Sequence, residues 1–466
     1  EIANVLGADG VHFMLDDARR APLKFCFGAP SCVPATGFET AGAVLDAAEV
    51  ERLLQTPAIG YLSEMMNFPG VLHADAQVLA KIAAARRLGK PVDGHAPGLR
   101  GEEARRYFAA GISTDHECFT YEEGREKTLL GVKILIREGS AARNFEALWP
   151  LLREFPEQIM FCSDDKHPDE LLNGHIDRLV ARAVAKGCDL FDTLRAACLN
   201  PAEHYRLPVG LLRPGDPADF VRVSDLEHFQ VLETWIDGVC VAANGKSRLE
   251  HRPPGTPNQF RAFPKTPADF HLPARHPNGI VRLIRAWDGQ IVTGREEGHA
   301  RLQDGRLHPY PAPDVLKIAV VNRYEPNALP AVGFVRGFGI QHGALASSVA
   351  HDSHNIVAVG TDDTALCAAV NAIIEARGGV CATDGSGNTE VLPLPVAGLM
   401  SPADGYELAR AYARLDAWTK ESLGGVLQAP FMALSFLALP VIPALKMTVR
   451  GLVVVSHFYF LPVEVG

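Results

Sequence analysis

The sequence predicts an α/β protein: a (β/α)8 barrel that lacks its first strands in this numbering, with a small flanking β domain and a C-terminal α+β domain. Short β-rich runs alternate with longer helical patterns up to about residue 205, which is typical of a parallel sheet built from βα units. Polar residues follow several of these runs, where barrels carry their active sites. Beyond residue 205 the alternation stops.

Six strands are predicted in the first part of the chain. Each is followed by a segment of helical character, among them Ala76–Leu88, Glu102–Ala110 and Phe145–Phe155. The predicted strands are Leu23–Gly28, Ile59–Ser63, Pro91–Gly94, Ile112–Asp115, Val132–Ile136 and Ile159–Ser163. Six strands are two short of a barrel, and the first lies near residue 23, so we expect the missing pair to precede residue 1.

The placement of polar residues favours a barrel over a doubly wound sheet. Glu64, His95, His116 and Asp164 all lie at or just past the C-terminal end of a predicted strand. A doubly wound sheet gathers its ligands at one switch point and usually carries a glycine-rich phosphate loop. No G-x-G-x-x-G or P-loop motif occurs in the sequence. The sequence therefore predicts a site shared by several strand ends.

The remaining chain divides into three parts after the predicted barrel, residues 1–205. Tight turns and alternating strands such as Val231–Ile236 and Gly238–Ala242 predict a small β domain over residues 206–250. Residues 251–279 contain many prolines without periodicity and are interpreted as a linker. Residues 280–466 mix strands and helices. The predicted elements there are strands Ile280–Ala286, Leu316–Asn322, Asn355–Gly360 and Gly451–Phe458, and helices Asp363–Arg377 and Pro402–Lys420.

Composition excludes several classes of protein. Of 466 residues, 47% are hydrophobic and 21% charged, which argues against disorder, collagen and coiled coil. A net charge of −10 argues against nucleic acid as a partner. The apolar stretch Ala429–Leu445 is interrupted by prolines, so we interpret it as buried core and expect no membrane association. Nine cysteines without a C-x-x-C pair favour a reducing cytoplasm.

Carboxylates and histidines at the strand ends are the candidates for chemistry. A carboxylate at the position of Glu64, after an apolar strand, needs a cation; alternatively it reaches solvent or an arginine. His95 and His116 occupy equivalent positions in successive βα units, although either could be a structural histidine. Asp164 and Asp165 leave the last strand together, so one could ligate metal while the other binds substrate, unless one caps the following helix. Such a nitrogen and oxygen ligand set suits Mn, Fe or Zn.

The motifs around these residues resemble those of the adenine deaminases, a family of the amidohydrolase superfamily. The resemblance covers essentially the whole chain. It rests on Ala29–Thr36 (APSCVPAT), Ser63–Val71 (SEMMNFPGV), Gly94–Gly98 (GHAPG), Thr114–Glu117 (TDHE), Ser163–Asp169 (SDDKHPD), Asn200–Ala202, Gly215–Asp219, Ala350–Ile356 (AHDSHNI) and Pro430–Pro443. The resemblance implies a metal-dependent barrel that hydrolyses adenine to hypoxanthine and ammonia through a metal-bound hydroxide.

Roles carried over from this resemblance follow the family pattern. Glu64 would be the carboxylate that bridges two divalent metal ions, most consistent with Mn or Fe, with Zn as a further option. His95, His116 and Asp164 would be further ligands. Asp164 would also act as the base, Asp165 would contact a purine ring nitrogen, and Glu117 would be a second proton carrier. The family's His-x-His pair occurs nowhere in the chain, so we expect it upstream of Glu1.

Two further groups are considered with the site. His351, Asp352 and His354 could reach the barrel mouth or bind another ion, or be structural. Asp362 precedes a helical pattern, and an N-cap explains it fully. The resemblance further implies a cytoplasmic homo-oligomer of purine salvage with a small-molecule substrate. The alternatives are another amidohydrolase acting on a cyclic amide or aminopurine, and a catalytically dead barrel that serves as a binding scaffold.

Overall fold

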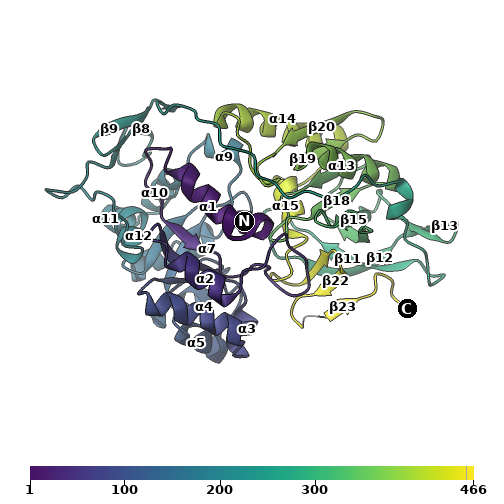
Figure 1. The fold of residues 1–466 in the computed structure, drawn as a ribbon, viewed down its shortest axis with the longest axis horizontal. Coiled ribbons are helices and arrows are strands. Elements are labelled where there is room, and N and C mark those ends of the chain that lie inside the picture. Colours follow the sequence, from purple (N-terminus) through teal and green to yellow (C-terminus); the bar gives the residue numbers. More distant parts are fainter. Residues whose placement is uncertain (458) are drawn as a thin grey trace.

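The computed structural model describes residues 1–457 and 459–466. Figure 1 shows two lobes side by side, with helix α1 (Ile2–Ala18) and helix α15 (Pro430–Phe436) between them. We call residues 1–205 the barrel unit and residues 280–466 the C-terminal unit. No described helix combines the length and the apolar character needed to cross a bilayer.

Six parallel strands in chain order organise the barrel unit in the described residues. One sheet holds β1 (Phe27–Ala29), β2 (Ile59–Met65) and β3 (Val92–Gly94), and a second holds β4 (Thr114–Asp115), β5 (Lys133–Arg137) and β6 (Ile159–Cys162). The Ser113 amide donates to the Val92 carbonyl across 2.9 Å and joins the two sheets. All six predicted strands are present in order, whereas the two strands expected upstream stay a prediction.

The first strand begins later than predicted, at Phe27 instead of Leu23. Lys24 lies before the strand, and its ammonium group pairs with Asp219 at 2.7 Å and with Asp237 at 2.8 Å. Both carboxylates belong to the small β region, so this segment connects the barrel unit to its neighbour.

Helices follow the strands of the barrel unit, and α2 begins with a capping box between Asp46 and Glu49. The predicted helix Phe145–Phe155 is interrupted at Pro150, which has no N–H to donate. The helices after α1 are α2 (Ala47–Leu54), α3 (Phe68–Leu72), α4 (Ala76–Arg87), α5 (Gly101–Ala109), α6 (Tyr121–Leu129), α7 (Phe145–Leu148), α8 (Leu151–Glu154), α9 (Pro168–Leu171), α10 (Ile176–Ala185), α11 (Leu190–Leu194), η1 (Arg195–Leu199) and α12 (Asn200–His204).

A small antiparallel sheet and an extended segment follow the barrel unit. The sheet contains β7 (Phe220–Val223), β8 (Val231–Ile236), β9 (Val239–Ala243) and β10 (Lys246–Ser247), close to the two predicted strands. Residues 251–279 contain one short 3-10 helix, η2 (Pro267–Phe270), within the described chain. Phe260 and Phe270 of this segment are buried against the C-terminal unit, so the segment wraps that unit closely. The domain boundaries themselves stay a prediction.

A mixed eight-stranded sheet forms the centre of the C-terminal unit in its described part, in the order β12-β11-β16-β15-β18-β17-β19-β20. These strands are β11 (Ile280–Arg285), β12 (Gly294–His299), β15 (Leu316–Val321), β16 (Ala331–Arg336), β17 (Ala344–Ser347), β18 (Ile356–Gly360), β19 (Gly379–Thr383) and β20 (Thr389–Pro393). Smaller sheets pair β13 (Arg301–Gln303) with β14 (Arg306–His308), and β21 (Leu445–Thr448) with β22 (Gly451–Val454) and β23 (Tyr459–Leu461). The predicted strand Gly451–Phe458 ends earlier, and Phe458 lies outside the described residues.

Both faces of the large sheet are buried, which explains why β15 is apolar at every position from Ile318 to Val321. Ile318 and Val320 face one hydrophobic cluster, while Ala319 and Val321 face another. Helix α13 (Asp363–Ala376) covers the second face. Its N-cap is Asp362, which accepts from the Ala365 amide at 2.8 Å, as predicted.

Helix α14 (Gly405–Leu423) starts later than predicted because Asp404 caps it, accepting from the amides of Tyr406 and Glu407. The predicted buried stretch after residue 429 is confirmed, and it serves two cores. Leu434 and Leu437 pack in the C-terminal unit, whereas Met432 and Phe436 pack in the barrel unit.

Candidate metal centre

The carboxyl ends of the parallel strands bring the predicted site residues together. Glu64 lies near the end of β2, His95 follows β3, His116 follows β4, and Asp164 follows β6. Because successive parallel strands end at the same edge, residues separated by up to a hundred positions in sequence meet there. This edge of the barrel unit is the candidate metal centre.

One oxygen of Glu64 contacts both histidines. Its Oε2 atom lies 2.9 Å from His95 Nδ1 and 3.1 Å from His116 Nε2. Glu117 Oε1 lies 3.5 Å and 3.4 Å from the same two nitrogens, and Asp164 Oδ2 lies 3.8 Å from His116 Nε2. Two groups have ligand atoms close enough to hold a metal ion: Glu64, His95 and His116, and His116, Glu117 and Asp164.

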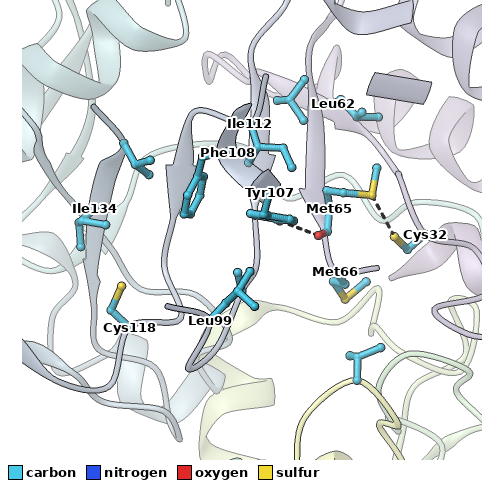
Figure 2. Packing of buried hydrophobic residues seen from close by; sticks show 14 of the residues in the cluster. Cys32, Leu62, Met65, Met66, Leu99, Tyr107, Phe108, Ile112, Cys118 and Ile134 are labelled. Atoms are coloured by element: carbon cyan, nitrogen blue, oxygen red, sulfur yellow. Dashed lines mark hydrogen bonds between the residues drawn. The ribbon is translucent and has the colours of Figure 1, made fainter. Parts of the chain in front are cut away.

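A buried tyrosine holds two of these strand ends in register. Figure 2 shows Tyr107 of α5 inside the barrel-unit core, with its hydroxyl directed at the end of β2. That hydroxyl donates to the Met65 carbonyl at 2.7 Å and accepts from the His95 amide at 3.0 Å. The backbone positions next to Glu64 and at His95 therefore share one anchor.

The carboxylates make the centre strongly attractive to a cation. Burial opposes ionisation of Glu64, but hydrogen bonds from His116 and His95 outweigh it and hold its pKa well below the usual value. Burial also disfavours the charged form of His116, yet Glu64, Glu117 and Asp164 raise its pKa to about 10. The negative charge around the two histidines therefore favours a cation at this point.

Arg137 is a site residue that the sequence analysis missed. It is the last residue of β5, is buried, and contacts Glu117 through Nη1 at 2.6 Å and Nη2 at 2.8 Å. Its Nη1 also pairs with Asp164 Oδ2. Burial disfavours ionisation of Asp164, and Arg137 together with His116 lowers its pKa nonetheless. The strand-end rule that selected Glu64 would also have selected Arg137.

Asp164 and Asp165 point in different directions, as expected. Asp164 faces the centre and has a positive φ of 56°. Asp165 points toward the C-terminal unit, where its Oδ2 lies 2.9 Å from His351 Nε2. Neither caps the next helix, because the N-cap of α9 is His167 and lacks a side-chain cap. The capping alternative for this pair is therefore wrong.

The residues at the centre fit a divalent metal ion. His95 is buried, and its Nε2 atom has no hydrogen-bond partner among the described residues. One ligand atom from each of Glu64, His95 and His116 lies within 4.8 Å of the other two, which is close enough to share a metal ion. Such a donor set suits first-row transition ions. The second group is partly neutralised by Arg137, which pairs with both of its carboxylates.

His351, Asp352 and His354 form a separate cluster in the loop between β17 and β18. His354 Nε2 contacts Glu1, and its Nδ1 accepts from the Ala350 amide at 3.2 Å. One carboxylate oxygen of Asp352 is buried without a partner among the described residues. Within the described chain this cluster is not one of the groups whose ligand atoms converge closely enough for a metal ion. Through His351 it contacts Asp165, which follows strand β6 of the barrel unit.

Family models match both units of the chain. Residues 1–241 match the amidohydrolase family, and residues 290–459 match the adenine deaminase C-terminal domain. The first match covers the strand ends that carry the centre. Fold and site thus define the class of protein as an amidohydrolase.

Curated relatives narrow this class further. The adenine deaminases of Salinibacter ruber and of a Sulfurovum species are each 55% identical to the chain, covering 99% of it and 84% of their own length. The adenine deaminase of Borreliella afzelii is 46% identical with similar coverage. The chain belongs to the adenine deaminase family, which confirms the resemblance. A solved β-aspartyl dipeptidase from Fervidobacterium islandicum covers 43% of this chain and 62% of its own, at 14% identity with a TM-score of 0.34, and this likeness is too weak to build on.

Proposed function

We propose that the protein hydrolyses adenine to hypoxanthine and ammonia. Water adds to C6 of the purine, the exocyclic amine leaves with an added proton, and the ring keeps the oxygen. The observation that carries this proposal is the convergence of Glu64, His95, His116 and Asp164 at one edge of a chain from the adenine deaminase family. Membership of the adenine deaminase family indicates adenine as the substrate. The convergence of metal-ligating side chains provides the means of activating water.

The metal complement is proposed as two divalent ions, most consistent with Mn or Fe, with Zn as an alternative. Glu64 would be shared between the two ions, and His95, His116 and Asp164 would supply the further ligands. Ions of this kind lower the pKa of a bound water and so supply a nucleophile at neutral pH. Support comes from the surplus of carboxylates around two histidines.

Asp164 is the proposed base. Its Oδ2 atom faces His116, and the neighbouring Arg137 keeps the carboxylate ionised, so it can take a proton from the attacking water. The same oxygen would return that proton to the departing amine. Glu117, which lies close to both histidines and to Arg137, is proposed as a second proton carrier.

Asp165 is the proposed substrate contact. Its carboxylate lines a cavity of about 760 Å³ between the barrel mouth, α1 and the C-terminal unit. A carboxylate there can accept a hydrogen bond from a purine ring N–H. We further propose a cytoplasmic homo-oligomer of purine salvage, without nucleic-acid or membrane partners, in keeping with the acidic charge and the cysteine pattern.

The test is ammonia release from adenine by protein purified with Mn²⁺ or Fe²⁺, with metal counted per chain on the same sample. A panel of aminopurines and cyclic amides is run in parallel. Turnover of adenine above the panel, with two ions per chain, is the expected result. Turnover of another panel member alone would replace the substrate, whereas a metal-free, inactive protein would favour the binding scaffold.

A further inference from the structure

We infer that His351 of the C-terminal unit is a positioning residue that orients Asp165 at the barrel mouth. The inference rests on the proposed function, because it concerns the residue proposed to bind the substrate. The two residues belong to different units and are 186 positions apart in sequence. His351 Nε2 nevertheless lies 2.9 Å from Asp165 Oδ2. Asp165 is half exposed toward the cavity, so its carboxylate needs an anchor on one side to present the other side to a ligand.

His351 is itself held in one orientation. Its ring stacks on Phe436 with the centroids 4.3 Å apart and the planes 2° from parallel. Its Nδ1 contacts the Ser435 hydroxyl, and its backbone amide donates to the same oxygen at 3.4 Å. Both partners lie on α15, the helix that packs in both cores. A buried imidazole with contacts on its face, its Nδ1 and its backbone has little freedom to turn.

The hydrogen bonds form a chain with a defined direction. The Asp165 carboxylate can only accept, so His351 Nε2 carries a proton and donates to Asp165 Oδ2, while Nδ1 shares its hydrogen bond with the Ser435 hydroxyl. Asp165 Oδ1, which has no hydrogen-bond partner among the described residues, can then accept from a substrate N–H in the cavity. The arrangement predicts that the C-terminal unit contributes to substrate affinity without touching the substrate.

Kinetics of His351→Leu and His351→Gln test this role. Loss of the donor in His351→Leu is expected to raise KM for adenine about tenfold with a smaller change in kcat, because a hydrogen bond to a carboxylate is lost. His351→Gln retains an N–H and should recover part of the affinity. His342→Gln, at an exposed histidine of the same unit, is the matched control. Bound metal should stay unchanged in all variants.

A double substitution separates positioning from a merely structural role. In an Asp165→Asn background, His351→Leu should raise KM little further, since its target carboxylate is gone. Additive effects on KM, or identical KM values for the Leu and Gln variants and the wild type, would overturn the inference. If the wild-type protein does not act on adenine, the proposed function fails. The inference is then judged by the same cycle on KM for whichever member of the substrate panel is turned over, where additivity would still overturn it.

Discussion

Two buried lysines, one in each unit, are stabilised in different ways. In the barrel unit, Lys127 Nζ donates to Asp115, Glu123 and the Ala96 carbonyl, each at 2.7 Å. In the C-terminal unit, the partners of Lys446 Nζ among the described residues are the carbonyls of Ile291 and Phe436, at 2.8 and 2.9 Å. Burial disfavours both charges. Carboxylates nevertheless raise the pKa of Lys127, whereas burial alone lowers that of Lys446 to about 7.

The difference explains where a cation can bind. The barrel unit is rich in buried carboxylates, and after Lys127 and Arg137 are paired, Glu64 still faces two histidines. In the C-terminal unit, the buried Lys446 donates to backbone carbonyls, and their dipoles stabilise a charge less than a carboxylate does. We therefore expect substitution of Lys127 to act through charge and substitution of Lys446 to act through proton uptake.

The largest effect is expected for Lys127→Met. The substitution leaves Asp115 and Glu123 buried without their cation, which typically costs about 4 kcal/mol of unfolding free energy. Denaturant unfolding at pH 7 measures the loss, with the exposed Lys246→Met as the control. Adding Asp115→Asn and Glu123→Gln should restore part of the stability. A loss below about 1 kcal/mol would contradict the charge-matched description of this core.

Glu64→Gln is expected to remove bound metal and activity together. Changing a residue that only supports a metal ligand typically lowers metal affinity or activity roughly tenfold to a hundredfold. Loss of a ligand itself should therefore reduce turnover at least about a hundredfold. Elemental analysis and ammonia release measure both quantities, with Glu102→Gln on the exposed face of α5 as the control. Full activity in the Gln variant would show that Glu64 does not hold the metal.

Asp165→Asn should separate substrate binding from metal binding. The Asn side chain keeps the shape of Asp165 but loses the negative charge that strengthens a hydrogen bond from a purine N–H. Turnover at low adenine concentration should therefore fall about thirtyfold. The metal content is expected to stay at the wild-type value in elemental analysis. Metal loss instead would mean that the roles of Asp164 and Asp165 are exchanged.

Lys446→Met should change the pH dependence of stability. The folded protein releases the Lys446 proton near pH 7, whereas the unfolded chain keeps it to about pH 10, so the unfolded state binds more protons in between. Wild-type stability therefore gains up to about 1.4 kcal/mol per pH unit from this group as pH rises from 7 to 10. The difference between wild-type and variant unfolding curves isolates this contribution. If the unfolding free energies of the wild type and the variant changed in parallel with pH, Lys446 would have an ordinary pKa.

Strand ends were predictable because their signals are local. The apolar run before Glu64, the Gly before His95 and the run before Asp164 fixed β2, β3 and β6 to within two residues. The cap at Asp362 was equally local. The roles of these residues stay proposals that the experiments above address.

Contacts between distant segments were not predictable from local patterns. The Tyr107 hydroxyl, the pairing of Arg137 with Glu117, and the contact between His351 and Asp165 each depend on tertiary placement. Such contacts leave no periodicity or spacing in the sequence. The sequence placed His351 among accessory residues without indicating its partner.

Helix α15 has a consequence for how the chain can be divided. It supplies Leu434 to one core and Met432 to the other, and its last carbonyl, at Phe436, is bound by Lys446. Neither unit retains a complete interior without it. The two units therefore cannot be exchanged independently between relatives. In a chimera, the strand ends of the barrel unit and residues 430–443 must come from the same protein.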